Sequence, residues 1–291
     1  MKAVILAGGT GTRLMPLTKV TNKHLLPVGD KPMIFHSLEK VREAGIREVL
    51  IVTGIDHMGD IVRLIGSGSD FNLSVTYRVQ DSPNGIAGAL NLARDFVGNS
   101  KFVVILADNI FSSGILDHTR AFLDLQEGTC MLLLKEVDQP QRFGVATVLE
   151  GSIQKIVEKP KNPESNLCIT GIYFFDRSVF DKISRIKPSS RGELEISDLN
   201  ELFLKSNKLN VSVLPRGTVW MDAGTIDSLH KATSYIESIE NTQLMKSACL
   251  EEIAWRNNWI DTNQLLELAS RLGINRYADY VRSIILWERH T

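Results

Sequence analysis

The chain has 291 residues, of which 43% are hydrophobic and 23% charged, a composition that suits one large or two small globular domains. The chain has 33 Lys+Arg and 34 Asp+Glu residues, and this nearly neutral charge argues against a nucleic-acid or membrane-surface protein. No apolar stretch approaches the length of a membrane span, and no secretory signal is visible. The three cysteines, Cys130, Cys168 and Cys249, form no CxxC pair, so we expect free thiols in a reducing cytoplasm.

Strands and helices alternate in the first half of the chain. The predicted strands cover residues 2–7, 47–53, 73–79 and 101–107, and the predicted helices cover residues 32–44, 57–65 and 86–96. Apolar strands between amphipathic helices indicate a mostly parallel sheet covered on both faces, and therefore a three-layer, Rossmann-like α/β core. Ligands bind to such sheets at the carboxyl ends of the strands. The segments ILAGG and ILADN place polar residues at two such ends.

The pattern changes after about residue 130. Three strands at 145–149, 153–157 and 168–175 are predicted to form an inserted lid over the edge of the sheet. A helix at 195–206, a strand at 210–214 and a helix at 226–240 follow, and the last segments, 250–257, 263–272 and 277–287, are all predicted to be helical. We therefore expect a core at 1–240 with a sugar-binding insertion, and a helical tail at 241–291.

The glycine-rich loop after the first strand reads GGTGTR at residues 8–13. Glycines let backbone N–H groups approach anionic oxygens closely, so the loop is typical of a phosphate cradle. The dinucleotide-binding pattern fails because Leu14 stands where its third glycine belongs, and the Walker pattern fails because GK[ST] is missing. The nearby cations Arg13 and Lys23 favour a triphosphate or a pyrophosphate leaving group. The alternative is a tight turn with surface charges.

Two lone aspartates are candidate metal ligands. Asp108 ends an apolar strand, and Asp222 precedes a predicted helix. Mg²⁺ typically takes one or two protein carboxylates and completes its shell with water and phosphate oxygens. Taken singly, each aspartate also fits a structural role, since Asp222 is close enough to the helix to cap it.

A second phosphate site is suggested by Lys159 and Arg191, while the Glu158 carboxylate suits sugar hydroxyls. The alternative is a solvated turn and an ordinary helix start. The six histidines form no zinc motif, and no GxSxG nucleophile is present, so a covalent mechanism has no obvious carrier.

An ordered set of motifs runs over nearly the whole chain: LAGGTGTRLMPLT, NKHLLPV, DKPMI, DNIF, RFGV, VEKP, TGIYFFD, RGELEISDLN and WMDAGT. Together they resemble the bacterial glucose-1-phosphate thymidylyltransferases, members of the sugar-nucleotide pyrophosphorylase superfamily. The tail segment CLEEIAWRNNWIDTNQLLELA resembles the helical extension of the longer, tetrameric members. The resemblance implies a nucleotidyltransferase core and a cytoplasmic homotetramer.

The reaction implied by the resemblance is the Mg²⁺-dependent conversion of dTTP and α-D-glucose 1-phosphate to dTDP-glucose and pyrophosphate. It would be the first step toward dTDP-rhamnose or related deoxysugars. The sugar phosphate attacks the nucleotide α-phosphorus in line, and because this nucleophile is already ionised no general base is needed. Catalysis then consists of aligning two anions and neutralising developing charge.

The resemblance also implies a role for each matched residue. Catalytic roles fall to Arg13, Lys23 and Lys159. Nucleotide contacts are expected from Gly8, Gly9, Thr10, Gly11, Thr12, Arg13, Lys23, Gln80, Gly85 and Asp108, with Gln80 and Gly85 at the thymine edge. The sugar phosphate is expected to contact Asn109, Gly144, Glu158, Lys159, Ile169 and Arg191. Asp108 and Asp222 are expected to hold Mg²⁺. A regulatory nucleotide site at a subunit interface is expected at Arg216, Glu252, Ile253 and Arg256, whose alternative role is to pack the tail.

Departures from the family pattern leave the choice of base open. Gly88 and His24 each stand where a glutamine is common, Ala223 replaces a common threonine, and Ala107 replaces a glycine. A uridylyltransferase using UTP is the main alternative, since uracil and thymine differ by one methyl group, worth about 1 kcal/mol of burial. A non-catalytic sensor is disfavoured because the expected cations and carboxylates are present. A DNA-binding tail is disfavoured because residues 250–274 are rich in acidic side chains.

Overall fold

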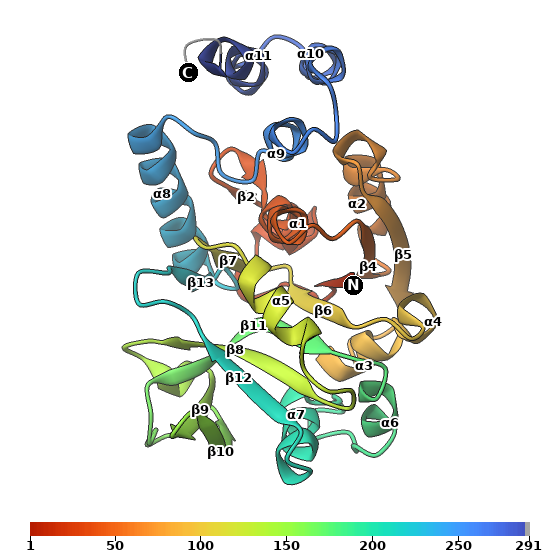
Figure 1. Ribbon diagram of the computed structural model, residues 1–291, viewed down its shortest axis with the longest axis vertical. Helices are drawn as coiled ribbons and strands as arrows, with labels where there is room; N and C mark the ends of the chain where they lie inside the picture. The colour runs from red at the N-terminus through yellow and green to blue at the C-terminus, as the bar shows by residue number, and fades with distance from the viewer. Residues whose placement is uncertain (289–291) are drawn as a thin grey trace.

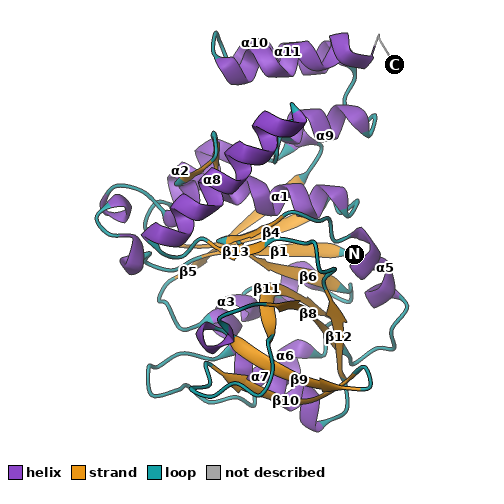
Figure 2. Cartoon of the chain, turned by 90° about the vertical axis from the view of Figure 1, so that its left-hand side faces the viewer, coloured by secondary structure: helices purple, strands orange, loops and turns teal. Residues whose placement is uncertain are grey.

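A nine-stranded mixed sheet with helices on both faces forms the body of the computed structural model, which describes residues 1–288 (Figures 1 and 2). Seven strands follow the order β10-β9-β11-β6-β1-β4-β5, β8 pairs with β11, and β12 pairs with β8. The strands are β1 (Lys2–Ala7), β2 (Pro27–Val28), β3 (Lys31–Pro32), β4 (Glu48–Gly54), β5 (Ser74–Gln80), β6 (Phe102–Leu106), β7 (Asn109–Phe111), β8 (Cys130–Glu136), β9 (Gly144–Leu149), β10 (Ser152–Glu158), β11 (Leu167–Phe175), β12 (Leu209–Val213) and β13 (Trp220–Asp222).

The parallel part of the sheet consists of β6, β1, β4 and β5. In β1, Ile5 faces one apolar cluster and Val4 faces the other, and both side chains are fully buried. Burial on both faces explains why these strands are apolar at nearly every position instead of alternating. The predicted three-layer α/β core is confirmed.

Two layers of helices cover the sheet. Figure 2 shows α1 on one side and α3, α6 and α7 on the other. The helices are α1 (Met33–Glu43), α2 (Met58–Ile65), α3 (Ile86–Asn91), α4 (Arg94–Val97), α5 (Leu116–Leu123), α6 (Val179–Ile183), α7 (Ile196–Lys205), α8 (Ile226–Gln243), α9 (Leu250–Arg256), α10 (Thr262–Arg271) and α11 (Arg276–Glu288). The single helix predicted at 86–96 is two helices, because Leu92 and Ala93 donate to carbonyls only three residues back and tighten the chain between α3 and α4.

The predicted lid is smaller than expected. β9 and β10 form an antiparallel hairpin at the end of the sheet, and β9 meets β11 at the pair Val145–Cys168. β11 itself runs antiparallel to β6 in the middle of the sheet. Nearly every side chain of β11 is buried, as in a central strand with both faces covered. Residues 168–175 therefore belong to the core and not to the lid.

The predicted helical tail is present as α9, α10 and α11. α9 packs on α1, where Leu250 joins the main core cluster (Figure 1). α10 and α11 share a second cluster with Cys249 and with Ala254 of α9. Within residues 1–288, no helix is both long and apolar enough to span a membrane.

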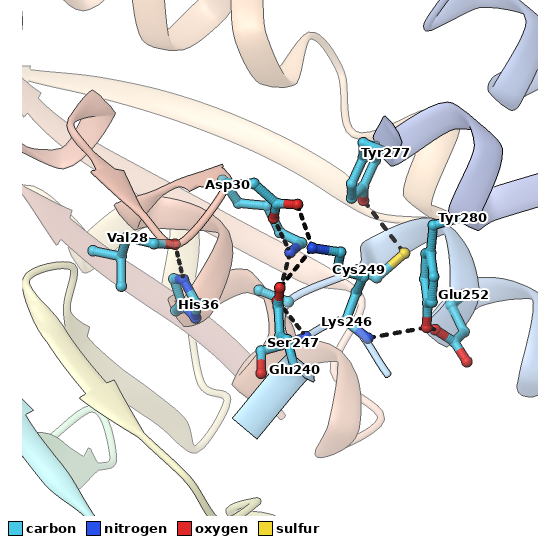
Figure 3. A network of polar contacts seen from close by, with 12 residues as sticks. Val28, Asp30, His36, Glu240, Lys246, Ser247, Cys249, Glu252, Tyr277 and Tyr280 are labelled. Carbon is cyan, nitrogen blue, oxygen red and sulfur yellow. Dashed lines mark hydrogen bonds and ion pairs between the residues drawn. The ribbon is translucent and has the colours of Figure 1, made fainter. Parts of the chain in front are cut away.

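Buried charges connect the tail to the core (Figure 3). The Nζ atoms of Lys31 and Lys246 each donate to both Glu240 and Asp30, at 2.5–3.0 Å. Glu240 also accepts from the backbone N–H of Ser247 at 2.9 Å. The two cations and two carboxylates form a neutral group of four, which we call the junction network, between α8, the β2–β3 turn and the start of the tail.

Candidate active site

The glycine loop and Asp108 lie at the same edge of the sheet. β1 and β6 are neighbouring parallel strands with Leu6 opposite Leu106, so the residues that follow them emerge side by side. Gly9 and Gly11 have φ angles of 99° and 61°, in the left-handed region that favours glycine. These two residues turn the chain sharply at the edge of the sheet.

A cavity of about 210 Å³ opens beside this turn. Of the predicted nucleotide-contacting residues, it is lined by Gly8, Gly9, Lys23, Gln80, Gly85 and Asp108. A neighbouring cavity of about 250 Å³ adds Thr10 and shares Gly9, Lys23 and Gln80. We call the two together the nucleotide cleft. Gly11 and Thr12 lie farther along the turn and line neither cavity.

Lys23 and Asp108 form a close ion pair, with Lys23 Nζ 2.5 Å from Asp108 Oδ2. Burial alone would raise the pKa of Asp108, but the Lys23 ammonium more than offsets it, and the pKa lies well below its ordinary value. Burial, followed by the charge of Lys23, lowers the pKa of the adjacent His24 to about 3, so this imidazole is neutral. Its Nδ1 lies 2.7 Å from Asn22 Oδ1.

A second cavity, of about 270 Å³, lies on the other side of Asp108. Its lining includes the predicted residues Arg13, Asp108, Asn109, Gly144, Glu158, Lys159, Ile169 and Asp222. We call it the sugar-side cavity. It shares Ile86, Leu106 and Asp108 with the nucleotide cleft, so the two spaces meet at the end of β6.

Asp108 and Asp222 are brought together by the short pairing of β7 with β13. Asp222 lies opposite Asn109, and Ala223 N–H donates to the Asp108 carbonyl at 2.8 Å. Burial, together with the neighbouring Asp108 charge, raises the pKa of Asp222. Arg13 lies close by, since a Cβ on Gly224 would be only 2.8 Å from its Nη2.

This carboxylate pair is chemically suited to a divalent cation. Two buried like charges repel each other, and a cation between them would relieve the repulsion. No cluster of three or more His, Cys, Asp or Glu side chains suitable for a metal occurs among the side chains that the structure describes, those of residues 1–286, so any ion here would rely on water or phosphate oxygens as well.

Asn109 is held in place by three hydrogen bonds. Its Oδ1 accepts from Trp220 Nε1 at 2.7 Å and from Gly171 N–H at 3.1 Å, while its Nδ2 donates to Asp108 Oδ1 at 2.9 Å. The Gly171 contact requires glycine, because a Cβ there would lie 2.4 Å from the Asn109 side chain. The irregularity in β11 between Ile169 and Tyr173 brings this N–H to the cavity.

Lys159 follows the β9–β10 hairpin in a left-handed conformation, with φ 44°. This conformation is unusual outside glycine and is enriched at functional sites. Its Nζ lies 3.2 Å from Glu158 Oε1, so the side chain is paired with its neighbour. Arg191 does not line the sugar-side cavity, since its guanidinium donates to both Glu195 carboxylate oxygens at 2.9 and 3.1 Å.

Several residues of the sugar-side cavity carry no role in the sequence predictions. The Phe143 and Trp220 rings, whose centroids are 4.8 Å apart, form an aromatic wall of the cavity, and Arg142 adds a cation. The motifs RFGV and WMDAGT contain these residues but do not show which side chains face the cavity. Asn200 on α7 also lines it, with a buried Oδ1 that has no hydrogen-bond partner, and only the folded structure reveals this.

Of the predicted regulatory residues, three lie together on α9. Glu252 accepts from the Tyr280 hydroxyl (Figure 3) and from Arg256 Nε at 2.8 Å. Ile253 packs against the main core. Arg216 lies on the exposed loop between β12 and β13, where its carbonyl accepts from a lysine side chain. The tail residues thus already have structural partners within the chain.

Comparisons with known proteins identify related sequences. A model of the nucleotidyl transferase family matches residues 2–239. A glucose-1-phosphate thymidylyltransferase of Neisseria meningitidis serogroup A is 43% identical, covering 98% of this chain and 99% of that protein. The enzyme of the same name from Mycobacterium tuberculosis is 37% identical, also covering 98% of this chain and 99% of that protein.

Two solved structures are similar as well. One, assigned as a glucose-1-phosphate thymidylyltransferase from Bacillus anthracis and solved with sucrose, is 51% identical with a TM-score of 0.77, covering 81% of this chain and 94% of that one. A UDP-glucose pyrophosphorylase complexed with UDP-glucose is 25% identical with a TM-score of 0.72, covering 81% and 98%. The chain therefore belongs to the nucleotidyl transferase family and, within it, to the glucose-1-phosphate thymidylyltransferases.

Proposed function

We propose that the protein transfers the thymidylyl group of dTTP to α-D-glucose 1-phosphate, forming dTDP-glucose and pyrophosphate as the first step toward dTDP-rhamnose or related deoxysugars. The observation that carries this proposal is the meeting of the nucleotide cleft and the sugar-side cavity at Asp108. Two ligands filling these spaces would touch at one point, as an in-line transfer requires. The names of the full-length relatives supply the two substrates.

On the nucleotide side, the backbone of the loop from Gly8 to Thr12 would wrap the phosphates. Gln80 and Gly85, which line the same cleft, would contact the base. Arg13 and Lys23 would neutralise charge that develops on the departing pyrophosphate. Because Lys23 pairs with Asp108 in the structure, its ammonium would turn from this carboxylate to the phosphates when nucleotide binds.

On the sugar side, Glu158, Asn109, Gly144 and the Ile169 backbone would bind the glucose hydroxyls. Lys159 and Arg191 would hold the sugar's phosphate. Lys159 lines the cavity already, whereas Arg191 would first have to leave Glu195. The Arg191–Glu195 ion pair is solvent-exposed and contributes little to stability, so breaking it to bind a phosphate costs little free energy.

We propose Mg²⁺ as the cofactor, bound by Asp108 and Asp222. Nucleotidyltransferases of this family generally use a divalent metal ion. The bound ion would neutralise phosphate charge where the two substrates meet. Lys159 and Arg13, which line the sugar-side cavity, would align the reacting phosphates, and no residue need act as a general base because the attacking oxygen is ionised.

A uridylyltransferase remains the second candidate. The UDP-glucose pyrophosphorylase structure shares the fold, but at 25% identity it is much less similar than the thymidylyltransferase relatives at 37–43%. The difference in identity favours dTTP over UTP.

We propose further that the protein is a cytoplasmic homotetramer regulated through its tail. All three cysteines are free and buried, which fits a reducing compartment. Ile274 and Leu286 on the tail are strongly exposed, as expected of side chains that a partner subunit covers. Arg216, Glu252, Ile253 and Arg256 would then receive a nucleotide product at the interface.

The test is a pyrophosphate-release assay with glucose 1-phosphate and each of dTTP, UTP, dCTP, ATP and GTP. We expect dTTP to give the highest kcat/KM, and chelation of Mg²⁺ to abolish release. Asp108→Asn should lower kcat by at least about 100-fold, because it removes the charge of one of the two carboxylates proposed to hold Mg²⁺. Release that is highest with UTP, or near-normal turnover in Asp108→Asn, would contradict the proposal.

A further inference from the structure

The Gln80 side chain at the end of β5 is held by its amide nitrogen. Nε2 donates to Asn84 Oδ1 at 2.6 Å and to the Gly85 carbonyl at 3.4 Å. A backbone carbonyl can only accept, so this second contact identifies which end of the amide is the nitrogen. Both Nε2 protons are therefore engaged inside the protein.

The Asn84 side chain occupies space that is free only because residue 88 is glycine. A Cβ built on Gly88 would lie only 2.1 Å from Asn84 Oδ1, so any side chain at 88 would displace the asparagine. The backbone of Asn84 is fixed separately, because its carbonyl accepts from Leu194 N–H at 2.8 Å. The glycine on α3 thus allows the side chain of Asn84 to reach Gln80.

The other end of the amide faces the nucleotide cleft. A Cβ on Gly8 would lie 2.9 Å from Gln80 Oε1, which places this oxygen against the glycine loop, and Gln80 lines both parts of the nucleotide cleft. Among the described side chains, residues 1–286, no donor is hydrogen-bonded to Oε1, and it is not among the fully buried unsatisfied atoms. Gln80 therefore presents an accessible acceptor and no donor to a ligand.

We infer that Asn84 is a positioning residue that selects the base by fixing the orientation of the Gln80 amide. This inference rests on the proposed function. Thymine and uracil carry a donor at N3, which matches Oε1, whereas N3 of cytosine is an acceptor and would face another acceptor. Rotating the amide to offer Nε2 would break both hydrogen bonds that hold it and leave the Asn84 oxygen unpaired.

The test compares kcat/KM for dTTP with kcat/KM for dCTP. Asn84→Ala removes the shorter of the two hydrogen bonds that hold the amide, and we expect the dTTP preference to fall about tenfold. Asn84→Asp keeps an acceptor at the same place and should keep the preference. KM for glucose 1-phosphate should be unchanged in both variants, because Asn84 does not line the sugar-side cavity.

Gly88→Ala provides an independent variant that leaves Asn84 in the sequence but pushes its side chain away. It should lower the dTTP preference as Asn84→Ala does. An unchanged preference in both Asn84→Ala and Gly88→Ala, a loss in Asn84→Asp as large as that in Asn84→Ala, or a wild-type protein that uses dTTP and dCTP equally would overturn the inference. If the wild type releases no pyrophosphate with dTTP, the proposed function itself fails.

Discussion

The pKa values of the two aspartates where the cavities meet are shifted in opposite directions. Asp108 has a cation 2.5 Å away and a lowered pKa, whereas Asp222 is buried beside Asp108 and has a raised pKa. The raised pKa means that folding disfavours the charged form of Asp222. A divalent ion that requires both carboxylates ionised should therefore bind more weakly as pH falls through the raised pKa of Asp222.

The neutral His24 predicts how stability depends on pH. Its native pKa is about 3, against 6.5 in an unfolded chain, so the unfolded state binds more protons between these values. Its contribution to stability is complete above pH 6.5 and declines as pH falls toward 3. In His24→Gln, the slope of the unfolding free energy between pH 4 and 6 should be shallower, by up to about 1.4 kcal/mol per pH unit. Urea unfolding at several pH values measures the slope.

His230→Gln is the matched control, because His230 is exposed on α8. Its slope should equal that of the wild type. An unchanged slope in His24→Gln would show that this imidazole is not held neutral in the native protein.

Many site residues could be predicted because their types are chemically distinctive and they follow apolar strands. The glycine turn, Asp108 and Asp222 are of this kind. Other site residues could not be predicted, because their roles depend on the space around them. Asn84 needs the missing side chain at Gly88, and Phe143 faces the Trp220 ring. Asn200 has a buried oxygen without a hydrogen-bond partner.

At the scale of elements, strand ends assemble the site. β1 and β6 deliver the loop and Asp108, and the short β7–β13 pairing adds Asp222. The parallel strands could be predicted from their apolar runs. Sequence order places β11 with the lid, because β11 follows the hairpin, and does not show that this strand inserts antiparallel beside β6. The short helix α6 and the long buried strand β8 are not among the predicted elements.

The junction network predicts a large stability effect at one position on α8. Glu240→Gln leaves the ammonium groups of Lys31 and Lys246 facing Asp30 alone. Removing one partner from a buried charge group typically costs about 3–5 kcal/mol, and we expect a loss near the lower end because Asp30 remains. Denaturant unfolding monitored by the tail tryptophans gives the change in free energy.

Glu237→Gln on the same helix serves as the control, because Glu237 is exposed and its substitution should change stability by less than about 0.5 kcal/mol. A loss of under about 1 kcal/mol in Glu240→Gln would contradict the role given to the network.

At the scale of the whole molecule, the reaction site and the tail lie on different parts of the core. The cavities open at strand ends around Asp108, while α9 packs on α1 and α10 and α11 extend beyond it (Figure 1). The predicted division of the chain at about residue 240 rests on the helical pattern of the last fifty residues. The surface of the proposed subunit contact could not be predicted from the sequence, because the exposure of apolar side chains such as Ile274 is known only once the chain is folded.

The most direct test of the account is a crystal structure of the protein with dTTP and Mg²⁺. We predict that the phosphates lie against the turn from Gly9 to Arg13, with the base beside Gln80 and the metal ion between Asp108 and Asp222. A complex in which the phosphates lie away from this turn would contradict the central claim that the glycine loop holds the nucleotide next to the sugar-side cavity.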